Sequence, residues 1–243
     1  QRLSFSQDFA GLAGSVRYLR SALNGTKYWS VFGGFTLSAH AEGGYIHPLQ
    51  KSPGPGRDAV RLTDRFFGPQ MRGFDVRGIG PRILRRNYVT EDGQLVLQDE
   101  SRVTDALGGR AYYMGRVELE FPTSSGLRSL GLRPSAFVDV GSLFRITHPA
   151  TDHILRFCTR TQNGVTETVI RRPGDAVTTC ATGFTETPGF EERVVGDSPT
   201  PRLTVGVGVN WVSPFGPLRI DIAKAVLKQD GDDTKFFSFN VGT

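Results

Sequence analysis

The sequence predicts an all-β protein, an antiparallel up-and-down β-barrel that spans a membrane. Glycine contributes 30 of the 243 residues, while hydrophobic residues make up only 38%, a composition that disfavours a helical protein. No stretch approaches 18 consecutive apolar residues, which excludes a membrane-spanning helix, whereas a spanning strand needs only about 9–11 alternating residues. Apolar and polar residues alternate with a period of two along much of the chain, as in strands that have one apolar face.

The first five expected strands occupy residues 1–8, 14–23, 29–46, 109–122 and 131–145. The third has apolar residues at Trp29, Val31, Phe35 and Leu37. In the fourth, apolar Val117, Leu119 and Phe121 alternate with Arg116, Glu118 and Glu120, and Pro122 ends the run. In the fifth, Ala136, Val138 and Val140 alternate with Phe137, Asp139 and Gly141. Each run therefore has two faces of different character.

The last three expected strands occupy residues 200–213, 217–228 and 234–243. The first of them has the most regular alternation, with Leu203, Val205, Val207, Val209 and Trp211 on one face. The segment from Ser213 to Pro217 is short and rich in proline, which predicts a tight hairpin. The acidic segment from Asp230 to Asp233 is brief, and we interpret it as a hairpin turn rather than a calcium-binding loop.

The connections between these strands differ greatly in length. Two polar inserts, residues 47–108 and 146–199, are very long, and the other connections are short. In an up-and-down sheet both inserts fall on the same side, because two strands separate them. Short turns at one end and long loops at the other are typical of an outer-membrane barrel, whose periplasmic turns are short and whose extracellular loops are longer.

A soluble lipocalin-like barrel or a sandwich is the alternative, because alternation alone does not say which face points inward. The charges decide between them. Several charged residues share the polar face of neighbouring expected strands, which suits a water-filled lumen containing ion pairs: Arg116, Glu118, Glu120, Asp139, Arg219 and Asp221. This favours the membrane barrel.

The charge and the cysteine content indicate which partners and which covalent bonds to expect. The net charge is +5, and nine basic against three acidic residues lie between Lys51 and Arg86. Without an aromatic ladder or a known binding module, nucleic acid is an improbable partner, and lipopolysaccharide or lumen carboxylates explain the charge better. In an exported chain Cys158 and Cys180 favour a disulfide over free thiols, and their spacing does not fit a metal site.

The first insert contains Met71-Arg72-Gly73-Phe74, with Ile79 to Arg82 closely after it. Five further motifs follow, at residues 105–109, 117–122, 137–141, 211–218 and 236–242. In this order they resemble the BamA family of outer-membrane assembly proteins, whose long extracellular loop carries a similar Arg-Gly-Phe signature. The resemblance covers most of the chain outside the second insert.

The signature has a physical interpretation of its own. Glycine at position 73 permits a close backbone approach or a positive φ, and the guanidinium of Arg72 suits bidentate pairing with a carboxylate. Glu120 and Asp139, on adjacent expected strands, are the natural acceptors, and the resemblance implies partners of this kind inside the lumen. The alternative is that Arg72 is a solvated loop charge.

The resemblance implies a function without an enzymatic step, a cofactor or a metal. No nucleophile elbow or phosphate-binding glycine loop is present, since Gly206 and Gly208 lie inside an expected strand. Such a protein would insert nascent β-barrel proteins into the Gram-negative outer membrane through a lateral seam. Its expected partners are those substrates, accessory lipoproteins of the assembly machinery, the bilayer and lipopolysaccharide. The terminal edge strand of the seam would contain Phe237, Phe239, Val241 and Gly242.

Two other functions share parts of this pattern. One is a translocation pore of the two-partner-secretion type, and the other is a barrel that anchors a surface-displayed enzyme. Eight strands are half of the sixteen that the resemblance implies, and the chain begins at Gln1. We therefore expect residues 1–243 to be the C-terminal half of a barrel, with POTRA domains and N-terminal strands absent and with the two inserts as extracellular loops.

Overall fold

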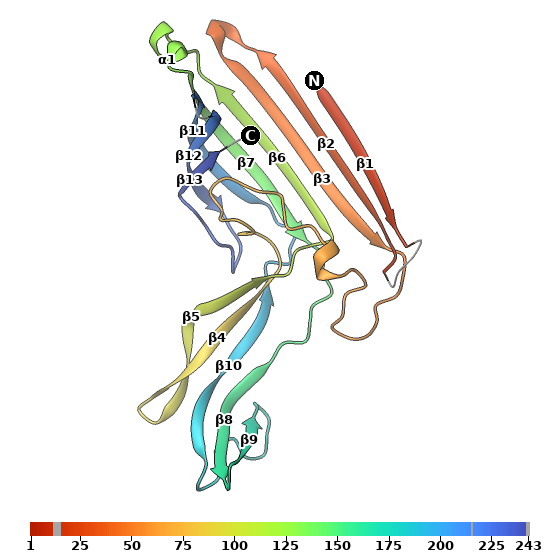
Figure 1. The fold of residues 1–243 in the computed structure, drawn as a ribbon, viewed down its shortest axis with the longest axis vertical. Coiled ribbons are helices and arrows are strands. Elements are labelled where there is room, and N and C mark those ends of the chain that lie inside the picture. The colour runs from red at the N-terminus through yellow and green to blue at the C-terminus, as the bar shows by residue number, and fades with distance from the viewer. Residues whose placement is uncertain (12–15, 215, 242–243) are drawn as a thin grey trace.

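The computed structural model describes residues 1–11, 16–214 and 216–241. These residues form strands β1 to β13, arranged in two sheets in which every pairing is antiparallel, together with a few very short helices. The larger sheet is curved, and the smaller one projects from one of its ends (Figure 1). The all-β antiparallel architecture is thus as the sequence predicts.

The larger sheet has eight strands in the order β1-β2-β3-β6-β7-β11-β12-β13. Their bounds are β1 Arg2–Ala10, β2 Tyr18–Ser30, β3 Thr36–Pro48, β6 Ala111–Glu120, β7 Leu132–Phe144, β11 Arg202–Ser213, β12 Gly216–Leu227 and β13 Phe237–Val241. Each corresponds to one of the eight strands expected from the alternation. Among the described strands, β1 and β13 have a single neighbour each and form the two edges.

The second and third strands lie further along the chain than expected. The expectation of 14–23 and 29–46 was wrong at the turn, which lies at the 3-10 segment Phe32–Gly34 and not near residue 25. Gly33 and Gly34 have φ of 65° and 83°, values that suit glycine, whereas Gly25 lies within β2. Residues 14 and 15 of the expected second strand lie outside the described part of the chain.

From the sequence we expected the two inserts to be long loops, but both contain strands. They supply five strands that form the second sheet, in the order β5-β4-β10-β8-β9. The first insert contributes β4 Arg82–Glu91 and β5 Gln94–Ala106, and the second β8 His153–Gln162, β9 Val165–Arg171 and β10 Thr185–Val195. On β4, β8, β9 and β10 few side chains are fully buried, so these strands lack the clear apolar face that alternation reveals.

The connections of the larger sheet divide between its two ends (Figure 1). One end has the turn at 31–35, the short helix α1 Ser125–Ser129 and the tight connection between β11 and β12. The opposite end has both inserts, including the short helix η2 Leu62–Asp64. Within the described residues, none of the helices has the length and apolar character needed to cross a bilayer.

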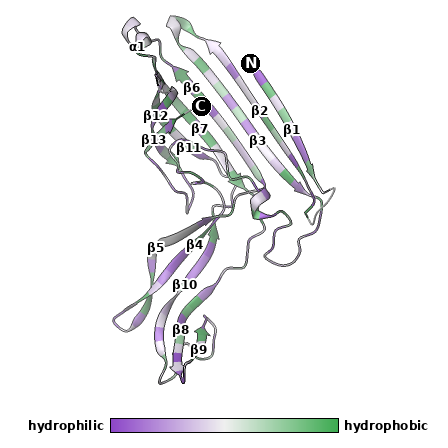
Figure 2. Ribbon diagram, viewed as in Figure 1, coloured by the Kyte–Doolittle hydropathy of each residue, from purple (hydrophilic) through white to green (hydrophobic). Residues whose placement is uncertain are grey.

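The two faces of the larger sheet differ in character. Its outer face carries exposed apolar side chains, including Phe5, Leu23, Val117, Val138, Val207, Ile222 and Phe239. Figure 2 shows hydrophobic and hydrophilic residues alternating along these strands. Its inner face carries both charged side chains and the apolar residues Ile46, Met114 and Leu143, and it is partly covered by residues 49–81, which fold back across it from the end of β3.

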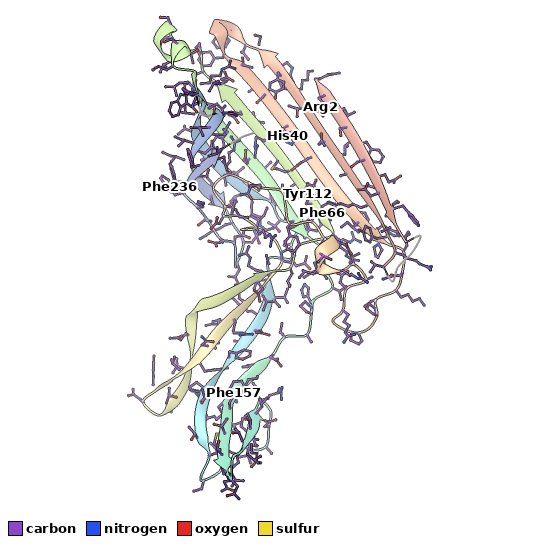
Figure 3. All side chains as sticks on the ribbon, in the orientation of Figure 1. Arg2, His40, Phe66, Tyr112, Phe157 and Phe236 are labelled. Atoms are coloured by element: carbon purple, nitrogen blue, oxygen red, sulfur yellow. A yellow bond between two sulfur atoms is a disulfide. The ribbon has the colours of Figure 1, made fainter. Side chains whose placement is uncertain are left out.

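The hydrophobic core lies between this returning segment and the inner face. It consists of Ile46, Val60, Phe66, Met71, Phe74, Ile79, Met114 and Leu143. Phe66 of the returning segment packs edge-on against Tyr112 of β6, with 4.7 Å between ring centroids, and the two lie side by side in Figure 3. The core therefore holds the signature segment inside the concavity.

Candidate functional site

The signature segment is held on the inner face by its two apolar side chains. Met71 is 1% exposed and Phe74 is 3% exposed, and both belong to the core. A Cβ added at Gly141 of β7 would lie 3.2 Å from Met71 Sδ, so this strand presents backbone to the methionine. Phe74 forms an isolated antiparallel bridge with Thr234, between β12 and β13. The loop is thus fixed on both sides of Arg72.

Gly73 allows the close approach. Its φ is +85°, and a Cβ there would lie 2.9 Å from Thr204 Cγ2 of β11 and 3.2 Å from Ala223 Cβ of β12. A side chain would therefore be strained in the backbone and would also overlap two strands. The glycine lets the loop lie directly on the sheet, which brings the neighbouring Arg72 side chain down to the inner face.

Arg72 uses its guanidinium fork on two carboxylates. Its Nε donates to Asp139 Oδ2 at 2.9 Å and its Nη2 to Asp139 Oδ1 at 2.6 Å. Its Nη1 donates to Glu118 Oε2 at 2.8 Å. The guanidinium carbon also lies 3.3 Å from the centroid of the Phe137 ring, in a cation–π contact. Three different strand residues therefore recognise one arginine.

Two further arginines share the same carboxylates. Arg116 Nε donates to Asp139 Oδ1 at 3.1 Å, and Arg219 Nη2 donates to Glu118 Oε1 at 2.9 Å. Arg219 also bonds Asp221 at 2.9 Å, and Ser135 Oγ donates to Glu118 Oε1 at 2.6 Å. We call the six charged residues the arginine cluster: Arg72, Arg116, Arg219, Glu118, Asp139 and Asp221.

The charges of the cluster balance, three positive against three negative, and half of its members are buried. Asp139 is fully buried, Asp221 is 1% exposed and Arg72 is 8% exposed, whereas the Arg116 side chain is 30% exposed. Removing a buried member would leave an uncompensated charge in a region that water reaches poorly, at a cost of about 3–5 kcal/mol. The arrangement can hold a loop in place, because each of its three carboxylates accepts from at least one arginine.

The expectation that Glu120 binds the loop arginine was wrong. Glu120 faces Arg133 at 3.6 Å, and the two side chains are 35% and 62% exposed. Along β6, Arg116 lies opposite Asp139 and Glu120 lies opposite Ser135. Glu120 is therefore four residues beyond the level of Asp139, about 13 Å along a strand that rises roughly 3.3 Å per residue. Glu118 occupies the place that the sequence interpretation gave to Glu120.

Four residues of the cluster were not assigned a role from the sequence. They share the polar face of their expected strands, so the alternation already placed them on the correct side of the sheet: Arg116, Glu118, Arg219 and Asp221. What was missing was the register between strands, which sets the height of each residue.

A comparison with protein families shows which superfamily this chain belongs to. The Omp85 superfamily domain matches residues 1–243. The chain belongs to the Omp85 superfamily. It is similar to the outer membrane protein assembly factor BamA of Neorickettsia risticii (strain Illinois), with 30% identity over 238 residues, which cover 98% of this chain and 23% of that protein. The chain therefore spans less than a quarter of the length of this curated relative.

A solved structure supports the fold of this Omp85 chain. It resembles the crystal structure of BamA from Haemophilus ducreyi lacking POTRA domains 1–3, with a TM-score of 0.55 and 21% identity. The match covers 91% of this chain and 34% of that one. The open eight-stranded sheet thus matches part of a barrel, and the resemblance to the BamA family inferred from the motifs is confirmed.

Three of the four residues assigned from the sequence to the last strand lie on β13, the strand at one end of the sheet order. Phe237, Phe239 and Val241 lie on β13 and are each more than half exposed, and β13 pairs with β12 between Leu218 and Ile222. Gly242, the fourth residue assigned to this edge, lies outside the described residues.

The disulfide is confirmed. Cys158 of β8 is bonded to Cys180, with 5.5 Å between their Cα atoms. The bond ties the segment between β9 and β10 to β8. Elsewhere in the described part of the Omp85 chain, histidine, cysteine and carboxylate side chains do not gather into a group that could hold a metal ion.

Proposed function

We propose that this chain is part of a non-enzymatic machine that inserts and folds β-barrel proteins in the bacterial outer membrane. Residues 1–243 would form the C-terminal half of its barrel. The Omp85 family and the BamA relative associate the chain with outer-membrane protein assembly. The observation that carries the proposal is the arginine cluster, in which a loop signature is folded into the concavity and neutralised by strand carboxylates.

The outer face supports a membrane position. Apolar side chains are exposed across β1, β6, β7, β11, β12 and β13, and lipid is the environment that stabilises such a surface. The short connections at one end would face the periplasm. The second sheet, with its disulfide, would face the outside, where an oxidising environment keeps such bonds intact.

Assembly would occur at the edge formed by β13. An edge strand offers unpaired backbone N–H and C=O groups, and an incoming strand can pair with them by β-augmentation. In lipid an unsatisfied backbone group costs several kcal/mol, so a weakly closed seam next to β13 would act as a template for a new strand. The substrates would be nascent outer-membrane β-barrel proteins.

Other partners follow from the same placement. In the intact protein, accessory lipoproteins would bind mainly through POTRA domains. Lipopolysaccharide would contact the outer rim. The energy for insertion would come from strand pairing and burial of apolar surface in lipid, with no cofactor.

The test is the substitution Arg72→Ala in the intact protein. It removes three side-chain hydrogen bonds and leaves Asp139 and Glu118 short of a partner. We expect faster proteolysis of residues 49–81 and impaired assembly of reporter barrels, measured in cells and in lipid vesicles. Arg133→Ala removes an exposed arginine from the opposite end of the sheet and is the matched control. Wild-type growth and unchanged protease sensitivity in Arg72→Ala would contradict the proposal.

A further inference from the structure

The segment between β12 and β13 does not form the simple hairpin turn that its acidic sequence suggested. Residues 228–236 instead lie against the signature segment. Asp75 N donates to the carbonyl oxygen of Asp233 at 3.0 Å, and Lys235 N donates to that of Gly73 at 3.1 Å. These two bonds flank the bridge between Phe74 and Thr234. The two segments are therefore joined as a miniature antiparallel ladder.

Glycine makes this approach possible. A Cβ at Gly78 would overlap the carbonyl oxygen of Asp233, and Asp233 N donates to the Gly78 carbonyl oxygen at 2.8 Å. A Cβ at Gly231 would lie 2.5 Å from Val195 and 3.2 Å from Arg82. Residues 228–236 are thus packed closely between the signature segment and the base of the second sheet.

A second buried ion pair fixes the same segment. Asp232 accepts from Arg202 at both carboxylate oxygens, from Nε at 3.0 Å and from Nη2 at 3.2 Å, and both side chains are fully buried. Arg202 directs its remaining donors to Ser142 Oγ at 2.7 Å and to the carbonyl oxygens of Gly196 and Ser198. Asp232 also accepts from Gln229 N at 2.7 Å. The pair is bidentate and its hydrogen bonds are satisfied, so it resists separation.

We propose that residues 228–236 are a clamp that positions β13, with Arg202 and Asp232 as its positioning residues. This deepens the proposed function, on which its role in assembly depends. The clamp joins β11 and the signature segment to the start of β13 at Phe237. Because the Phe237 end of β13 is fixed, separation of β13 from a neighbouring strand would begin at the Val241 end of β13. A signature loop anchored by Arg72 thereby sets the position of the edge strand offered to a substrate.

The matched pair of substitutions is Asp232→Asn and Asp230→Asn. Both remove one negative charge from the same segment without changing its size. Asp230 pairs with Arg193 at 2.7 Å, but both side chains are about half exposed or more, so its loss should cost little. We expect proteolysis within 228–236 to become at least about tenfold faster in Asp232→Asn and to stay unchanged in Asp230→Asn.

The position of β13 is measured directly with nitroxide labels at Phe239→Cys and Val205→Cys in the intact protein. Both side chains are exposed on the outer face, and the native cysteines are bonded to each other. We expect a narrow distance distribution in the parent and in Asp230→Asn, and a broad or displaced one in Asp232→Asn. Equal distributions in the two variants would overturn the clamp.

A cross-link restores the clamp without the ion pair. Cysteines at Asp75 and Asp233, whose backbones are hydrogen-bonded, form a disulfide on oxidation, which mass spectrometry verifies. We expect Asp232→Asn to assemble reporter barrels poorly, and the oxidised but not the reduced cross-link to restore assembly. Asp232→Asn alone, with and without reductant, controls for the native disulfide.

These experiments distinguish failure of the proposed function from failure of the clamp proposal. If Arg72→Ala assembles substrates normally, the proposed function is wrong, while the label distances still decide whether the clamp positions β13. If the distances broaden but assembly by Asp232→Asn stays normal, or the oxidised cross-link restores nothing, the positioning role in assembly is overturned.

Discussion

The Arg72 side chain anchors the signature segment through contacts with three residues of the larger sheet. Its fork reaches two carboxylates on different strands, and the Phe137 ring covers its face. A lysine would carry the same charge but could not donate in this planar pattern. Arg116 and Arg219 neutralise what remains of the carboxylate charge. The loop is therefore held by geometry as well as by charge.

The two glutamates of β6 provide a residue-scale prediction. Glu118→Gln removes the acceptor charge for both Arg72 and Arg219 in a mostly buried position, and we expect a loss of about 3–5 kcal/mol in stability together with a mobile signature loop. Glu120→Gln removes only an exposed pair with Arg133, which is worth about 0–1 kcal/mol. Thermal unfolding in detergent and proteolysis of residues 49–81 measure both effects.

One result with Glu118→Gln and Glu120→Gln would contradict this prediction. Equal effects of the two substitutions, or a larger effect of Glu120→Gln, would show that the ladder register along β6 does not determine which glutamate serves the loop.

At the scale of elements, the inserts carry turn signals that the alternation did not reveal. β4 and β5 are joined at Asp92-Gly93, and β8 and β9 at Asn163-Gly164. Asp92 and Asn163 have φ of 49° and 51°, and the glycine after each is also positive. These dipeptides favour the two-residue turns of β-hairpins. They were the sequence signal for the second sheet.

The disulfide gives a prediction for this sheet. In the double variant Cys158→Ser, Cys180→Ser, the segment between β9 and β10 loses its tie to β8, and a cross-link that closes a loop of this size is worth about 3 kcal/mol. We expect faster amide hydrogen exchange in residues 172–184 and unchanged exchange in the eight-stranded sheet. The effect is local because the clamp and the arginine cluster are intact.

Two observations check this result. Reduction and alkylation of the parent should give the mass shift of two thiols and the same local exchange. Unchanged protection of residues 172–184 in the variant would mean that hydrogen bonds alone hold this segment.

At the scale of the whole molecule, the larger sheet separates two environments. Its outer face is apolar and exposed, whereas its inner face carries buried ion pairs and the returning loop. Such a sheet is stable only if lipid or a comparable apolar medium contacts its outer face. Contact between water and this large apolar surface would be unfavourable in free energy. The polar lining then needs the internal hydrogen bonds that the two ion-pair groups supply.

An arginine placed on the outer face tests this arrangement. Val207 lies in the middle of β11 and is 55% exposed, and Val207→Arg should cost about 2–4 kcal/mol if this position lies near the centre of a bilayer. Val165 of β9 is 70% exposed on the second sheet, and Val165→Arg should be tolerated. Folding of the intact protein into lipid vesicles, followed by heat-modifiable gel mobility, measures both.

Equal folding yields for the two variants would place Val207 outside the membrane. A defect confined to Val165→Arg would contradict the assignment of the two sheets to their environments.

The sequence by itself determined the number of strands in the larger sheet, the two faces of the regularly alternating ones, the signature segment and the cysteine pair. These depend on local patterns, because alternation, turn residues and short motifs act over a few neighbouring residues. Tertiary structure decided that Glu118 and not Glu120 binds Arg72, that the inserts form a sheet, and that Asp232 meets Arg202. Those features depend on register and on contacts between residues far apart in the chain, which a one-dimensional pattern does not specify.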